Sequence, residues 1–255
     1  MHDPLEGRTA DGMITTGVGL ERVPEIYREV LDAAIDAVAT HGASLYLYGS
    51  VATGRADPPR SDVDLLTIGL TPETASSLSD TLSARFSALA RRVEIAPAAA
   101  SDFAGGGDPA YGGRIFLHHY CAHLTGEDHD RATEPFPADT RAARGLNGDI
   151  GIALDGWRSR LADPGGTVDG RRVARKTLLA VAGLVSVHDR TWTTDRLGSA
   201  SRWAELQPSL AADLALLAAW SERDDQGDDA AVEHMVIEVV PEIVSAFAEE
   251  IGLWG

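Results

Sequence analysis

Cysteine and lysine are almost missing from this 255-residue chain, because each occurs once, as Cys121 and Lys176. A single cysteine excludes an intrachain disulfide and fits a reducing compartment, so we expect a cytoplasmic protein. No apolar run approaches the roughly 18 residues that cross a bilayer, which argues against an integral membrane protein. The polar start, MHDPLEGRTADGM, argues against a secretory signal peptide.

Basic residues are in the minority, with 22 against 39 acidic ones, and the formal net charge is −17. A general nucleic-acid binder needs a basic surface, so we expect neither a nucleic-acid partner nor a membrane partner. Two interpretations of the acidity remain open. It can simply keep the protein soluble, or it can draw a cationic substrate into an acidic cleft.

Hydrophobic periodicity predicts an α/β first half. The segment 71–90 is the best-marked helix, since Thr71 can cap it and Pro72 suits its first turn. A Gly-rich loop is expected over 103–113. The other predicted elements are helices over 23–40 and 115–124 and strands over 44–49, 62–70 and 91–98.

The second half reads as helix throughout, after a polar, turn-rich segment over 126–149. We therefore expect an α+β protein, with an N-terminal domain (1–148) built on a mixed sheet flanked by helices and a C-terminal all-helical domain (149–255). Residues 1–20 lack periodicity and are predicted to be a loose leader. The helices are expected over 151–162, 172–188, 199–222 and 231–254.

The stretch YLYGSVATGRADPPRSDVDLLTIG, residues 46–69, places two carboxylates inside an apparent strand. Side chains alternate along a strand, so Asp62 and Asp64 point the same way. Two neighbouring carboxylates repel each other, and burying them without a partner is costly. A divalent cation resolves the conflict, because Mg²⁺ binds through one or two carboxylates together with substrate phosphates. The pair predicts a magnesium site.

Gly49 and Ser50 follow the first strand of this stretch, where a helix can begin. Glycine lets backbone N–H groups approach a phosphate closely, and the serine hydroxyl can donate a further hydrogen bond. GxxxxGK[ST] and GxGxxG are both absent, so this is neither a P-loop nor a Rossmann turn. A phosphate-holding turn followed by a metal-holding pair predicts a site for a nucleoside triphosphate with Mg²⁺.

Gly49-Ser50, Gly54 and Ser61-Asp62-Val63-Asp64-Leu65 together resemble the polymerase-β-like nucleotidyltransferases. The helical half, with LDGWRSRLA and RKTLLAVAGLVSVHDRTWTTDRLGSASRWAELQP, is similar to the C-terminal domain of streptomycin/spectinomycin adenylyltransferases. The resemblance implies transfer of AMP from ATP to a hydroxyl of a small cationic acceptor, an aminoglycoside. It also implies a third carboxylate on a neighbouring strand, for which Glu94 is placed correctly.

The resemblance, together with a basic cluster that starts a helix of the second half, suggests a role for each candidate residue. Asp62, Asp64 and Glu94 are the expected metal ligands and catalytic residues, with Glu94 as general base. Arg171, Arg172 and Arg202 are further basic residues that could contact the triphosphate, in addition to the set named next. The nucleotide-binding set is Gly49, Ser50, Arg175, Lys176 and Arg196, and the acceptor-binding set is Trp157, Asp163 and Asp169.

Other interpretations of the same residues stay open. The acceptor can be a protein side chain, as in antitoxin-type adenylyltransferases, or the chain can be a nucleotide-binding regulator without turnover. His119 and His123, at helical i, i+4 spacing, can be read as zinc ligands, but no second ligand pair accompanies them, so we read them as packing or surface residues. A monomer or weak dimer is expected.

Overall fold

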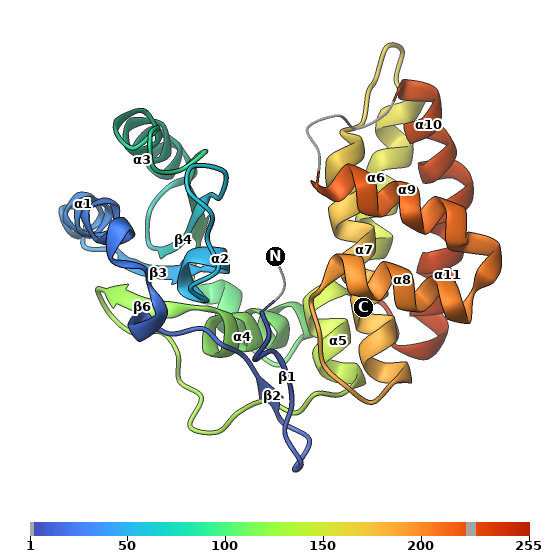
Figure 1. Ribbon diagram of the computed structural model, residues 1–255, viewed down its shortest axis with the longest axis horizontal. Helices are drawn as coiled ribbons and strands as arrows, with labels where there is room; N and C mark the ends of the chain where they lie inside the picture. Colours follow the sequence, from blue (N-terminus) through green and yellow to red (C-terminus); the bar gives the residue numbers. More distant parts are fainter. Residues whose placement is uncertain (1–2, 223–227) are drawn as a thin grey trace. The chain divides into compact units, whose positions relative to one another are not determined.

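The structure, a computed structural model, describes residues 3–222 and 228–255, which divide into two compact units. Unit 1 comprises residues 3–5 and 15–135, and unit 2 comprises residues 6–14 and 136–255. Unit 1 contains a mixed sheet with helices on it, whereas unit 2 is largely helical (Figure 1). The predicted α+β class is confirmed.

A four-stranded sheet with the order β5-β4-β3-β6 organises unit 1. The central strand β3 is antiparallel to both of its neighbours, while β4 and β5 are parallel to each other. Because β4 and β5 run in the same direction, their first residues lie at the same end of the sheet. The strands are β3 (Ser44–Tyr48), β4 (Val63–Ile68), β5 (Val93–Ala98) and β6 (Ala122–Thr125).

Strand alternation divides the core of unit 1 between the two faces of the sheet. On one face, Leu47 and Leu65 are fully buried in a cluster with residues of α1 (Arg28–Ala39) and α3 (Pro72–Arg85). On the other face, Tyr46 and Leu66 pack with Leu117 of α4 (Asp108–Tyr120). Helices therefore cover both faces, and polar side chains are tolerated only near the strand ends.

The helix predicted over 23–40 starts later than expected. Two 3₁₀ turns, η1 (Leu20–Arg22) and η2 (Glu25–Tyr27), precede α1. Val23 is extended because the ring of Pro24 disfavours the helical conformation in the residue before it. By contrast, the Thr71 hydroxyl accepts a hydrogen bond from the Thr74 N–H at 3.3 Å, so the predicted cap of α3 is confirmed.

The region 103–125 differs most from its prediction. Helix α4 already begins at Asp108, inside the expected Gly-rich loop, with Pro109 in its first turn. The helix ends at Tyr120, and the following residues form β6, which completes the sheet beside β3. His123 therefore lies on a strand and not one helical turn from His119, so the helical spacing that suggested zinc ligands does not exist. Pairing with β3 overrides the local helical pattern.

Unit 2 is largely helical, and prolines interrupt or distort two of its predicted helices. The segment predicted as one helix over 199–222 is interrupted at Gln207 and Pro208, and the last segment contains a π-helical turn just before Pro241, which has no N–H to donate. The elements are α5 (Thr140–Asn147), α6 (Ile150–Ala162), α7 (Gly170–His188), α8 (Arg196–Leu206), η4 (Pro208–Leu210), α9 (Ala211–Glu222), α10 (Asp229–His234), η5 (Met235–Val239) and α11 (Val240–Glu250).

The division between the units falls at 135/136, so the predicted boundary at 148/149 lies inside unit 2, between α5 and α6. Helix α5 belongs to unit 2 because its last turn is tied to the C-terminal tail. The Arg144 guanidinium donates to the Ile251 carbonyl at 3.0 Å, and the Trp254 indole donates to the Arg144 carbonyl at 2.8 Å. These bonds join segments more than 100 residues apart, which local sequence patterns cannot reveal.

The predicted loose leader is ordered in its middle part. Strands β1 (Gly7–Arg8) and β2 (Ile14–Thr15) pair as a small sheet. The Glu6 carboxylate accepts hydrogen bonds from the Thr194 backbone N–H at 2.7 Å and the Thr194 hydroxyl at 2.8 Å. The leader was missed because its partners lie far away in the sequence.

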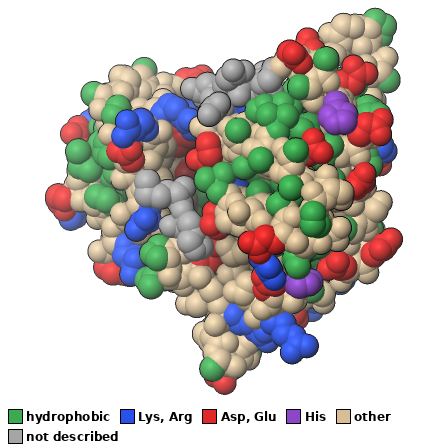
Figure 2. All heavy atoms as spheres, turned by 45° about the vertical axis from the view of Figure 1, so that its right-hand side comes forward, with side chains coloured by type: hydrophobic (Ala, Val, Ile, Leu, Met, Phe, Trp, Pro, Cys, Tyr) green, Lys and Arg blue, Asp and Glu red, His purple; other side chains and the backbone are tan. Residues whose placement is uncertain are grey.

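Acidic side chains lie among basic and apolar ones over the face shown in Figure 2. This distribution fits the interpretation that the net charge of −17 is largely solvated. Within the ranges 3–222 and 228–255, none of the helices is both long and apolar enough to cross a bilayer.

We predict an acid-sensitive contribution to stability from His119 of α4, which is only 7% exposed. Burial, followed by the nearby His118, lowers the pKa of His119 from 6.5 to about 4. Stability from the neutral imidazole is complete above pH 6.5 and is lost as the pH falls toward 4, by a total of about 3 kcal/mol. Urea unfolding between pH 7 and 4 should show a shallower loss for His119→Phe, whereas exposed His41→Phe should keep the wild-type slope.

Candidate functional site

Three carboxylates meet at one end of the sheet of unit 1. Asp62 immediately precedes β4, Asp64 is the second residue of β4, and Glu94 is the second residue of β5. Asp64 and Glu94 are direct partners in the parallel register. Each of the three side chains offers one oxygen, and these oxygens all lie within 4.8 Å of one another. The convergence predicted from the sequence is confirmed.

The arrangement follows from strand geometry and carries a large electrostatic cost. Asp62 and Asp64 are two residues apart and face the same side, and the register brings Glu94 alongside. Both aspartates are half-buried, and Glu94 is exposed. Two like charges about 4 Å apart repel by about 1 kcal/mol in bulk water and about 4 kcal/mol near a protein surface. The group therefore favours a compensating cation.

Gly49 gives the Asp64 carboxylate the space that it occupies. Tyr48, the last residue of β3, pairs with Asp64, and Gly49 follows with a φ of +73°. A Cβ atom at position 49 would lie 2.3 Å from Asp64 Oδ2, which is well inside contact distance. Position 49 thus requires glycine both for its backbone conformation and for the close approach of Asp64.

Ser50 lies on the short helix α2 (Gly49–Ala52), and the chain then returns to β4 through a closed turn. The Ser50 carbonyl accepts a hydrogen bond from the Arg55 N–H at 2.8 Å. Further on, the Ser61 hydroxyl accepts one from the Asp57 N–H at 2.8 Å. The motif serine at position 61 thus closes the loop that delivers Asp62.

Arg91 is a member of the site that the sequence analysis did not identify. Its Nε donates to Asp62 Oδ1 at 3.0 Å, and its Nη2 donates to Asp62 Oδ2. The available signal was its position three residues before Glu94, at the start of a strand predicted to lie beside the one that carries Asp64. The strand register was needed to turn that position into a contact.

The basic residues predicted to bind the nucleotide all belong to unit 2. Arg175 and Lys176 are half-buried on α7, and Lys176 forms an ion pair with Asp149. Arg196, the first residue of α8, pairs with Glu222 at 3.2 Å. These contacts join elements within unit 2, so they give both Lys176 and Arg196 a structural role.

The alternative basic candidate, Arg202, contacts two carboxylates, whereas Lys176 and Arg196 each pair with one. Its guanidinium donates to both carboxylate oxygens of Asp189, at 2.8 and 3.1 Å, and to Glu205 at 2.7 Å. The hydrogen bond from Arg202, with a second one from His188, lowers the pKa of Asp189 to about 2. Arg202 therefore serves the connection between α7 and α8.

The predicted acceptor-binding residues lie on α6 and at the start of α7. Trp157 is half-buried on α6, and Asp163 is exposed where that helix ends. Asp169 caps α7, because its carboxylate accepts a hydrogen bond from the Arg172 N–H at 3.2 Å. Trp192 and Trp203 are buried, so they belong to the core of unit 2.

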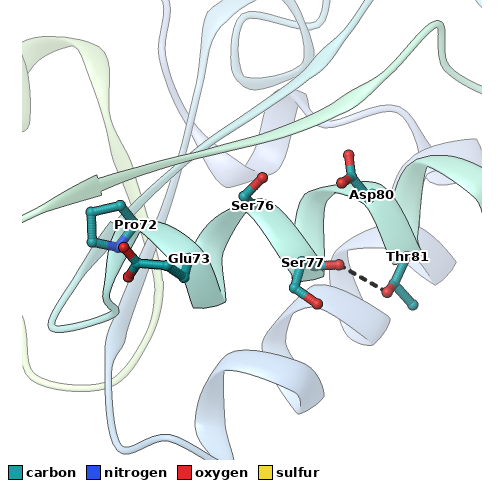
Figure 3. A pocket seen from close by; sticks show the side chains of 6 residues that line it. All are labelled: Pro72, Glu73, Ser76, Ser77, Asp80 and Thr81. Carbon is teal, nitrogen blue, oxygen red and sulfur yellow. Dashed lines mark hydrogen bonds between the residues drawn. The ribbon is translucent and has the colours of Figure 1, made fainter.

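A shallow hollow on α3 is a separate feature of unit 1 (Figure 3). Within it, the Thr81 hydroxyl donates to the Ser77 carbonyl at 2.9 Å. All of its lining residues come from one helix, and none is a member of the carboxylate group. They are Pro72, Glu73, Ser76, Ser77, Asp80 and Thr81.

Residues 28–96 match the family described as nucleotidyltransferase domain, and this range contains Gly49, Ser50, Arg91 and all three carboxylates. The chain contains a nucleotidyltransferase domain. It begins at α1 and ends in β5, so the core of the sheet and the carboxylate group belong to it. No curated protein sequence matches the chain.

Most of the chain is similar in fold to a solved structure. This is the spectinomycin adenyltransferase AAD(9) from Enterococcus faecialis, determined with ATP and spectinomycin. The similarity covers 91% of this chain and 97% of the other, with 13% sequence identity and a TM-score of 0.50. The match extends well beyond the nucleotidyltransferase domain, into the helical unit.

Proposed function

We propose that the protein is a Mg²⁺-dependent nucleotidyltransferase that transfers AMP from ATP to a hydroxyl of a small cationic acceptor, an aminoglycoside. The observation that carries the proposal is the convergence of Asp62, Asp64 and Glu94 next to Gly49 and Ser50 within the nucleotidyltransferase domain. Bound ATP and spectinomycin in the protein of similar fold support the choice of nucleotide and acceptor class.

The donor set of the carboxylate group fits a hard divalent cation. All three groups supply oxygen, which is the ligand atom that Mg²⁺ prefers, and their mutual repulsion is relieved when a cation binds. Asp62, Asp64 and Glu94 would hold the ion. When bound, Mg²⁺ would neutralise charge on the triphosphate and on the departing pyrophosphate.

The remaining steps rely on residues of the chain. Gly49 leaves its backbone accessible to a phosphate, and the Ser50 hydroxyl can donate to a phosphate oxygen. The acceptor oxygen forms a bond to the α-phosphorus while the bond between the α-phosphorus and the bridging oxygen breaks, and pyrophosphate leaves. Glu94 takes the proton of the attacking hydroxyl, a contribution of about 10²–10⁴-fold.

Unit 2 would supply the other contacts of the substrates. Arg175, Lys176 and Arg196 are proposed to reach the triphosphate, where guanidinium and ammonium groups pair with phosphate oxygens. Lys176 and Arg196 would then exchange or share their present contacts with Asp149 and Glu222. The residues proposed to bind the acceptor are Trp157, Asp163 and Asp169, whose aromatic ring and carboxylates suit a cationic sugar.

Incubation with α-labelled ATP and Mg²⁺ tests this function. The acceptors are spectinomycin, streptomycin and further aminoglycosides, and mass spectrometry measures an added AMP. We expect one or more drugs to gain AMP with release of pyrophosphate, and Glu94→Gln to lose about 10²–10⁴-fold in rate.

Other outcomes of the same assay separate the competing functions. Label that appears on protein and not on drug would indicate a protein-modifying adenylyltransferase. Mg²⁺-dependent ATP binding without pyrophosphate release across the whole panel would indicate a nucleotide-binding regulator. The first result would overturn the proposed acceptor, and the second would overturn the proposed enzymatic function.

A further inference from the structure

Arg91 occupies both oxygens of a carboxylate that the proposed function assigns to a cation. The Arg91 Nε lies 3.0 Å from Asp62 Oδ1, and its Nη2 binds Oδ2, so the guanidinium fork faces the whole carboxylate. The Asp62 side chain is 15% exposed and that of Arg91 is 42% exposed. Within the ion pair, the Asp62 carboxylate is therefore largely shielded from solvent, whereas the Arg91 guanidinium remains accessible to it.

The backbone fixes Arg91 at this place. Its N–H donates to the Ser61 carbonyl at 3.1 Å, and the Val63 N–H donates to the Arg92 carbonyl at 2.9 Å. These two bonds extend the parallel pairing of β4 and β5 to the residues just before each strand. Arg91 therefore approaches the carboxylate group on the same segment that carries Glu94.

A divalent cation and this guanidinium compete for the same oxygens. Charge-assisted hydrogen bonds of an arginine fork are strong because they are bidentate. A cation bound to Asp62 would use an oxygen that now accepts from Arg91, and it would repel the guanidinium at close range. An ion pair that is stronger in the absence of the cation therefore weakens cation binding, since the two equilibria are linked.

We propose that Arg91 is a positioning residue that holds Asp62 while the cation is absent and is displaced from it when the cation binds. The inference rests on the proposed function, because it takes Asp62 as a cation ligand. Displacement leaves an exposed guanidinium beside the site, where a phosphate group of the incoming nucleotide can replace the lost carboxylate partner. The site then favours the cation together with a triphosphate over the free cation.

Binding of Mn²⁺ in the absence of nucleotide tests the inference, measured by the electron paramagnetic resonance signal of the free ion. We expect Arg91→Ala to bind Mn²⁺ about five- to tenfold more tightly than the wild type, near the low end of usual couplings between sites. The matched control is Arg92→Ala. Arg92 is the next residue, but its Nη2 lies 4.0 Å from Asp80 Oδ1, so its ion-pair partner is Asp80 and not Asp62. This control should keep the wild-type affinity.

A double-mutant cycle shows whether the effect passes through Asp62. In an Asp62→Asn background, Arg91→Ala should change Mn²⁺ affinity much less than it does in the wild-type background. Thermal melting provides a second readout that also reports folding: Arg91→Ala should melt lower than the wild type without a cation and gain more from added Mn²⁺. Equal or weaker Mn²⁺ binding by a folded Arg91→Ala variant would overturn the inference.

The inference and the proposed function can fail separately. Tighter Mn²⁺ binding by Arg91→Ala, with no AMP transfer by the wild type to any acceptor, would support the role of Arg91 and reject the enzyme. AMP transfer by the wild type, with unchanged Mn²⁺ affinity in Arg91→Ala, would support the enzyme and reject the role of Arg91.

Discussion

Asp64→Asn is expected to abolish AMP transfer while the protein stays folded. The substitution keeps the size of the side chain and removes the charge at the centre of the carboxylate group, between Tyr48 and Glu94 in the sheet register. We expect a loss on the order of 10³-fold in rate, comparable to removing one group that stabilises charge in a transition state. Steady-state assays with the best acceptor measure this loss.

Asp64→Asn should not lower the stability of the folded protein. A loss of activity can then be assigned to the site and not to unfolding. Removing one of three mutually repelling carboxylates should keep or raise the melting temperature without a cation, and the stabilisation by added Mg²⁺ should shrink. Asp80→Asn, on α3, is the control and should match the wild type in both measurements. Near-full activity of Asp64→Asn would show that Asp64 does not hold the metal.

Gly49→Ala is expected to have a comparably large effect for a steric reason. The new methyl group would lie 2.3 Å from Asp64 Oδ2, so the carboxylate must move away from Asp62 and Glu94. The φ of +73° adds a backbone cost of about 1–2 kcal/mol for a residue with a side chain. We expect transfer to fall by at least about 10²-fold, as when a catalytic geometry is displaced by 1 Å.

Gly42 provides a control with the same backbone conformation and no steric conflict. Its φ is +66°, and a Cβ atom there would meet nothing within 4 Å. Gly42→Ala should therefore lower the free energy of unfolding in urea by the same backbone cost of about 1–2 kcal/mol but keep the wild-type transfer rate. Gly49→Ala should lower both the free energy of unfolding and the transfer rate. Equal rates for the two variants would refute the role of Gly49 in seating Asp64.

The carboxylate group could be predicted because its information is local. Asp62 and Asp64 are two residues apart, and a strand places them on one side whatever the remaining fold is. Glu94 needed one further step, the pairing of β4 with β5, which the family resemblance implied and the register shows. The motif and its three carboxylates could thus be predicted from the sequence.

Arg91, β6 and the leader were out of reach because each depends on a distant partner. The Arg91 side chain points at Asp62 only after the parallel register is known. Residues 122–125 continue a helical pattern, yet they extend because β3 offers an unpaired edge. The Glu6 carboxylate meets Thr194, a contact between residues 188 positions apart that no periodicity encodes. At each of these places the observed structure is determined by contacts with distant residues and not by local sequence propensity.

The grouping of residues 6–14 with the helical unit changes what an N-terminal truncation would mean. The polypeptide passes between the units at 5/6, 14/15 and 135/136, so the halves are interlaced along the chain and not simply joined end to end. Trimming the first fourteen residues would remove the Glu6 carboxylate and the Met13–Pro137 bridge from the helical half and leave the four-stranded sheet complete. A fragment that starts at 136 would be an incomplete module for the same reason.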